Sequence, residues 1–169
     1  MAEMPLAIFI VVVCLALPLL ILVTLTIRVA FFWNATRECA KAAAECTTFE
    51  QNAGTEEISA INRANLTASK CLSAFSGLAF DKVDLFIVTT PATALGVGSP
   101  SVLPANTKLA GPADPANNVY EVRADVSGSV DPLVTMSSSF FGDVPGLTRA
   151  FPLRMSSQRV VESPQSWNY

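Results

Sequence analysis

The sequence predicts an α+β fold: a long N-terminal transmembrane helix continues outside the membrane, a second helix packs antiparallel to it, and a small antiparallel C-terminal β-sheet packs on the helices. Residues 6–27 form an uncharged, almost wholly apolar run. The segment after it is rich in helix formers, and the C-terminal half contains a clear alternation of apolar and polar residues. We expect a transmembrane anchor over 1–33, an extramembrane helical hairpin over 34–78 and a sheet domain over 79–169.

Composition and charge argue against several classes of function. The 169 residues carry a net charge of −3 with scattered basic side chains, which is no electrostatic footprint for nucleic acid. The chain contains no histidine, so the commonest general base and metal ligand are missing. No GxSxG, glycine-rich phosphate loop or HExxH motif occurs. We therefore expect a non-enzymatic protein without a cofactor or metal.

The apolar run is long enough to be a membrane anchor. Its 22 residues span about 33 Å as a helix, which covers the hydrocarbon core of a bilayer. The preceding residues carry one charged side chain, Glu3, so we expect a retained anchor rather than a cleaved signal peptide. Pro18 lacks a backbone donor, which predicts a kink or local loosening there. Phe31, Phe32 and Trp33 are predicted to be aromatic anchors at the lipid surface.

The helix is expected to continue through residues 34–48, which are rich in alanine and charged helix formers. A turn at 51–55 then precedes a second helix, predicted from Glu56 to about Phe75. Because the connection is short, the two helices should form an antiparallel hairpin. The expected apolar stripe of the second helix consists of Ile58, Ile61, Leu66, Ala68 and Leu72.

The C-terminal half predicts strands at 83–90, 120–127 and about 152–162. The middle one has the cleanest signal, with apolar side chains at every second position from Tyr120. A long loop over 91–118 separates the first two strands, and an exposed tail follows the last. Strands joined without intervening helices imply an antiparallel sheet with one face on the helices.

The cysteines leave the orientation open. In the expected hairpin, Cys71 lies about 6 Å along the axis from Cys39 and about 16 Å from Cys46. A Cys39–Cys71 disulfide is therefore the favoured pairing, and three buried free thiols are the alternative. A disulfide implies an oxidising, extracytoplasmic compartment, whereas the basic residues that follow the anchor favour a cytoplasmic domain.

The residues Asp125, Ser127 and Ser129 spell the DxSxS element of metal-ion-dependent adhesion sites. Such a site needs further ligands from a larger α/β domain, and only 40 residues follow Ser129 here. The alternation of the segment instead predicts that these side chains form the polar face and end of an ordinary strand.

Two features resemble TadE-like proteins, the minor pseudopilins of the tight-adherence (Flp) pilus system. Glu3 precedes the apolar run, and the segment 34–40 (NATRECA) follows about 31 residues later. The resemblance implies a single-span protein of the bacterial cytoplasmic membrane with an extracytoplasmic C-terminal domain. It also implies that the Glu3 carboxylate meets the N-terminal amine of a neighbouring subunit, and that the partners are pilus machinery.

A second interpretation comes from another class of protein. The same architecture suits an accessory structural subunit of a larger membrane complex, such as a respiratory, transport or photosynthetic assembly. Filament assembly predicts many copies and dependence on Glu3, whereas a fixed subunit predicts one copy per complex and indifference to Glu3→Gln.

Overall fold

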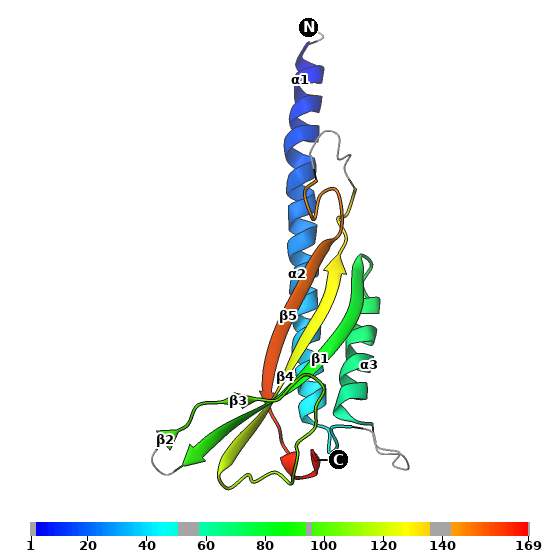
Figure 1. Ribbon diagram of the computed structural model, residues 1–169. Coiled ribbons are helices and arrows are strands. Elements are labelled where there is room, and N and C mark those ends of the chain that lie inside the picture. Colours follow the sequence, from blue (N-terminus) through cyan, green and yellow to red (C-terminus); the bar gives the residue numbers. More distant parts are fainter. Residues whose placement is uncertain (1–2, 51–57, 94–95, 136–142, 169) are drawn as a thin grey trace.

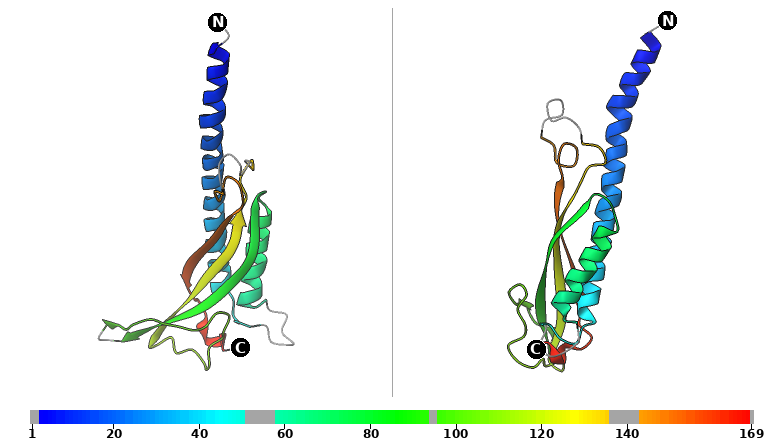
Figure 2. Two further views of the ribbon diagram at one scale, coloured as in Figure 1. Left: turned by 45° about the horizontal axis from the view of Figure 1, so that its top comes forward. Right: turned by 90° about the vertical axis from the view of Figure 1, so that its right-hand side faces the viewer.

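The computed structural model describes residues 3–50, 58–93, 96–135 and 143–168. A helical rod, a second helix and an antiparallel sheet make up its α+β arrangement, as predicted. The rod extends well beyond the sheet at its N-terminal end, and the sheet packs along its C-terminal half (Figure 1). Both helices lie on the same face of the sheet (Figure 2).

The rod consists of α1 (Glu3–Val11), a π-helical turn η1 (Val12–Ala16) and α2 (Leu17–Ala44), which follow one another without a break. The π-turn ends directly before the turn that contains Pro18, where the missing N–H interrupts the regular hydrogen-bond pattern. The loosening expected at Pro18 is therefore this π-turn. Within the described residues, the rod is the one helix long and apolar enough to cross a membrane.

Helix α3 (Ala60–Ser73) runs back along α2 and completes an antiparallel hairpin (Figure 1). The Ser59 hydroxyl caps its start by accepting a hydrogen bond from the Asn62 N–H at 3.3 Å. The predicted start at Glu56 is wrong, because residues 58 and 59 are not helical and the helix begins at Ala60. The predicted turn at 51–55 lies outside the described residues.

The predicted apolar stripe of α3 is partly wrong. Ile58 and Leu66 are 52% and 49% exposed, respectively. The buried positions recur every four residues and are Ala60, Ala64, Ala68 and Leu72. Three of these four positions are alanine, which lets the backbones of packed helices approach closely.

Three long strands form the sheet: β1 (Leu78–Thr93), β4 (Asn118–Val130) and β5 (Phe151–Val160), all antiparallel with β4 in the centre. The predicted strands are confirmed, although β1 is longer at both ends. The predicted loop over 91–118 also contains two short strands that pair with β1, namely β2 (Gly96–Val97) and β3 (Ser101–Val102). The β5 strand forms one edge of the sheet.

The C-terminal segment is not the exposed tail that the sequence predicts. A 3-10 turn, η2 (Pro164–Ser166), brings Trp167 into the core, where it is fully buried. The indole Nε1–H donates to the carbonyl oxygen of Cys46 at 2.9 Å, and the ring lies 5.3 Å from that of Phe49. The Trp167 side chain thus ties the end of the chain to the end of α2.

The sheet lies close to α2 at Gly128 on β4. A Cβ atom at this position would lie 2.9 Å from the Phe32 ring and would overlap the carbonyl oxygen of Ala79 on β1. Phe32 is fully buried there, so the absence of a side chain at Gly128 makes room for the helix.

We expect Gly128→Ala to lower the free energy of unfolding by about 1–3 kcal/mol, because the added methyl group displaces the Phe32 ring or the β1 backbone. Thermal unfolding of the full chain in detergent measures the effect. Gly111→Ala is the control, since nothing lies within 4 Å of its Cβ position. Equal midpoints for the two variants would contradict this account of the packing.

Candidate functional site

The N-terminal part of the rod presents a bare apolar surface. We call residues 3–27 the apolar rod; large apolar side chains stand exposed along it. They are Met4, Ile8, Phe9, Ile10, Val11, Val12, Leu15, Leu19, Leu20, Leu22, Val23 and Ile27. A contiguous apolar surface of this size marks a membrane or protein contact. The apolar rod therefore requires lipid or another apolar helix around it.

The three predicted aromatic anchors have different environments. Phe31 and Trp33 are 38% and 46% exposed, whereas Phe32 is fully buried against the sheet. The Phe31 ring stacks on that of Phe75, which follows α3, with 4.0 Å between ring centroids. Successive helical residues point about 100° apart, so Phe32 faces the core while its neighbours stay at the surface.

Arg28, the first charged residue after the apolar rod, fastens the sheet to α2. Its Nη1 donates a hydrogen bond to the carbonyl oxygen of Asp131, directly after β4. The guanidinium also lies against Gly77, directly before β1, where a Cβ atom would be 2.6 Å from the guanidinium carbon. The Asp131 N–H in turn donates to the Gly77 carbonyl oxygen at 2.9 Å. We call these three residues the Arg28 clamp.

Only glycine suits position 77. Its φ of +79° lies in the left-handed region, and a side chain there would collide with the Arg28 guanidinium. The sequence marks Gly77 only as a helix end and Arg28 only as a charge beside the anchor. The contact between Arg28 and Asp131 joins residues 103 positions apart, so no local pattern predicts it.

Two hollows lie on the surface of the rod near the clamp, and Arg28 lines one of them. One, of about 220 Å³, lies between α2 and the residues that follow α3. The other, of about 270 Å³, is almost wholly apolar and shares Ile27 and Phe31 with the first. Their remaining lining residues are Thr24, Arg28, Phe75, Ser76 and Leu133 in the first, and Ala30 and Asn34 in the second.

A larger hollow of about 480 Å³ lies further along α2, beside β5. Its lining mixes both charge signs: Glu38, Lys41, Ala44, Glu45, Arg159, Val160 and Glu162. An edge strand presents unpaired backbone groups, and charged side chains limit unspecific strand pairing there. The lining of this hollow therefore places charged side chains beside the β5 edge of the sheet.

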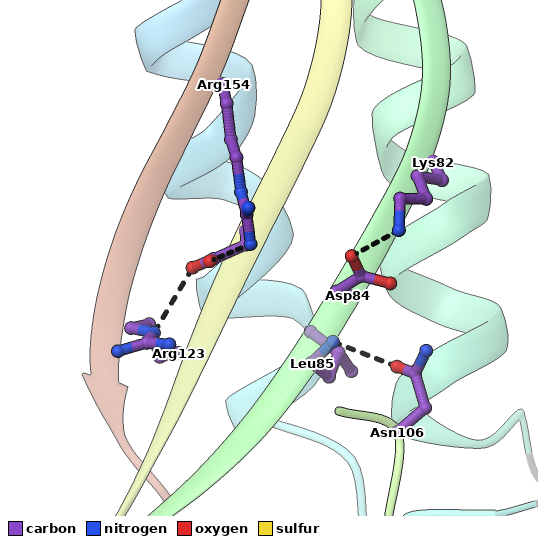
Figure 3. Close-up of polar contacts among 7 residues, drawn as sticks. Lys82, Asp84, Leu85, Asn106, Arg123 and Arg154 are labelled. Atoms are coloured by element: carbon purple, nitrogen blue, oxygen red, sulfur yellow. Dashed lines mark hydrogen bonds and ion pairs between the residues drawn. The ribbon is translucent and has the colours of Figure 1, made fainter. Parts of the chain in front are cut away.

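Asp125, on β4, forms two ion pairs, with Arg123 and Arg154, whose side chains are drawn in Figure 3. Its carboxylate lies 2.9 Å from Nη2 of Arg154 and 3.2 Å from Nε of Arg123; the second contact is an ion pair without hydrogen-bond alignment. Asp84 stands opposite on β1 and is paired with Lys82 at 2.7 Å. Arg123 and Arg154 form ion pairs with the Asp125 carboxylate. The DxSxS segment therefore lies in β4 and contributes polar side chains to one face of the strand.

The described cysteines are free thiols. Burial raises the pKa of Cys39 to about 12, and the nearby Cys71 and Glu38 add to the increase. Burial also raises the pKa of Cys46, against the lowering effect of Arg63. Cys39 and Cys71 are thus neighbours across the helix pair, and the disulfide between them stays a prediction.

Glu3 is the first residue of α1, and its side chain lies outside what the structure describes. Comparisons of the chain with protein-family models, with curated proteins and with solved structures give no match. The functional interpretation therefore rests on the residues and geometry of this chain.

We expect Arg28→Met to lower the free energy of unfolding by about 1 kcal/mol, because the Asp131 carbonyl oxygen loses a charged donor. Thermal unfolding in detergent should show a midpoint about 2–4 °C lower. Arg37→Met, at an exposed position of the same helix, is the matched control. A midpoint unchanged by Arg28→Met would show that the clamp contributes nothing to stability.

In the reduced chain, iodoacetamide at pH 8 should modify Cys71 before Cys39, because Cys71 is only partly buried. With its pKa near 12, about one Cys39 thiol in ten thousand is ionised at this pH. Peptide mapping of the native and the unfolded chain, without reductant, measures both sites. Joined Cys39 and Cys71 peptides would confirm the predicted disulfide, and alkylation of both residues in the unfolded, unreduced chain would exclude it.

Proposed function

We propose that this chain is a non-enzymatic, single-span membrane protein that acts as a TadE-like minor pilin or pilus-assembly component. The observation that carries the proposal is one uninterrupted rod whose first half is bare and apolar and whose second half is packed against a sheet domain. Such a helix anchors in lipid, packs laterally against other apolar helices and holds its domain in a fixed place for protein contacts.

The exposed surfaces of the chain support lateral assembly. Apolar side chains surround the apolar rod, so neighbouring helices have several faces on which to pack. Two hollows lie further along the same helix: the apolar one at Ile27 and Phe31, and the charged one beside β5. Neighbouring subunits thus have an apolar contact near the clamp and a charge-selective contact beside the sheet.

Glu3 has a role in this proposal because of its position. It precedes the apolar run, and an unpaired carboxylate near hydrocarbon is unfavourable. The N-terminal amine of an adjacent subunit supplies an opposite charge. In the proposed arrangement the rod crosses the bacterial cytoplasmic membrane and the sheet domain lies on its extracytoplasmic side, near the pilus machinery.

The proposal is tested by purifying the tagged full chain in mild detergent, identifying the bound proteins by mass spectrometry, and examining the sheared-filament fraction of the cells. We expect recovery with pilus-assembly proteins or in filaments. Glu3→Gln should abolish it, because the charge pair is lost. Glu50→Gln, at the far end of the hairpin, is the matched control and should leave recovery unchanged.

Stoichiometric recovery with a single large membrane complex, unaffected by Glu3→Gln, would contradict the pilus role. That result would assign the chain as an accessory structural subunit instead.

A further inference from the structure

The connection between β4 and β5 lies at the end of the sheet that is nearest the apolar rod (Figure 1). Its described residues are 131–135 and 143–150, and we call them the β4–β5 loop. Seen from the side, the segment that follows β4 reaches the rod (Figure 2).

Three contacts show which residues of the rod lie beside the loop. Asp131 is held by Arg28 in the clamp. Further along, Leu133 lines the same hollow as Thr24 and Ile27. In the second part of the loop, residues 143–150, a Cβ atom at Gly146 would lie 3.2 Å from the side chain of Leu25.

These contacts place the loop beside the apolar rod itself. Thr24 and Leu25 precede Arg28 in the chain, which corresponds to about 5–6 Å along the helix axis. An interfacial element buries its apolar side chains about 5–10 Å into the boundary between headgroups and acyl chains. The loop therefore reaches the depth at which such elements lie when the rod is in a bilayer.

The side chains of the loop suit that depth. Leu133, Val134 and Val144 are 53%, 54% and 39% exposed, so their apolar surfaces are not covered by the sheet. The charges of Asp143 and Arg149 are paired at 3.2 Å.

Backbone groups within residues 143–150 also hydrogen-bond to one another. The N–H groups of Leu147 and Thr148 donate to the Val144 carbonyl oxygen at 3.1 and 2.9 Å, and that of Gly146 donates to the Arg149 carbonyl oxygen at 2.8 Å. Internal pairing lowers the cost of moving polar groups out of water.

We propose that the β4–β5 loop is a second membrane contact, in which Leu133, Val134 and Val144 insert into the lipid interface beside the emerging rod. The occupant of this surface is lipid, because the surface is continuous with the apolar rod and at the same level. The proposal rests on the membrane span of the proposed function, although not on the pilus role. Two points of attachment fix the sheet domain against rotation, so its contact surfaces face a constant direction.

Photo-crosslinking of the full chain in phosphatidylethanolamine–phosphatidylglycerol vesicles tests the proposal. Benzoylphenylalanine replaces, one at a time, Val134, Val144 and two control valines at the opposite end of the sheet. The controls match in exposure, with Val102 at 49% and Val119 at 40%. A fifth probe replaces Leu19 in the apolar rod. Mass spectrometry measures the fraction of chain that carries a lipid adduct.

We expect lipid adducts at positions 19, 134 and 144 in at least fivefold excess over positions 102 and 119. Adducts at 19 without any excess at 134 and 144 would overturn the loop contact and leave the membrane span intact. Crosslinks from 134 and 144 to a second copy of the chain, in place of lipid, would also overturn it. A lack of adducts at 19 would refute the membrane span and the loop contact together.

Discussion

The packing of one face of α2 against α3 and the sheet holds the described structure together. From Phe32 to Ala44 the buried side chains of this face are mostly alanine, with Cys39 and Thr36 among them. Small side chains permit close approach of backbones, and the alanines of α3 match them at four-residue spacing. The sheet then covers both helices with its valine, leucine and isoleucine side chains. Since α2 continues directly from the apolar rod, fixing the domain on α2 also fixes it relative to the rod.

The Arg28 clamp lies at the point where the surroundings of the rod change. Before Arg28 the apolar side chains of the rod are mostly bare, and after it the helix is covered on one side by protein. Its guanidinium connects the helix to the end of β4 and the start of β1, so both long strands are held at one level. In the proposed membrane setting, this charge lies at the lipid surface, where an arginine stem remains in apolar surroundings and its head stays polar.

Much of the fold was predictable from local patterns. The apolar run, the alanine-rich segment and the alternation from Tyr120 each have a period that identifies one element, and α2, α3, β4 and β5 follow from them. Hydrophobicity favours Ile58 and Leu66 for the buried stripe of the second helix, but Ala60 and Ala64 are the residues that are buried.

Other features depend on contacts between distant residues. The two-residue strands β2 and β3 are too short to show a period, and they exist because β1 extends far enough to pair with them. Burial of Trp167 depends on the Cys46 carbonyl oxygen at the end of α2. Among the candidate contact residues, Phe31 and Trp33 are exposed, whereas Phe32 is buried in the core. No local signal connects Arg28 with Gly77 and Asp131, so the sequence does not predict the clamp.

The central claim is that one unbroken helix carries both the apolar rod and the sheet domain. Hydrogen–deuterium exchange of the full chain in lipid nanodiscs tests it most directly, because amides in a continuous helix exchange slowly and those in a hinge exchange fast. We predict uninterrupted protection from Leu19 to Ala44, including the stretch around Arg28 where the surroundings change. Fast exchange between Arg28 and Asn34, at the rate of exposed loops, would show a hinge there and contradict the account.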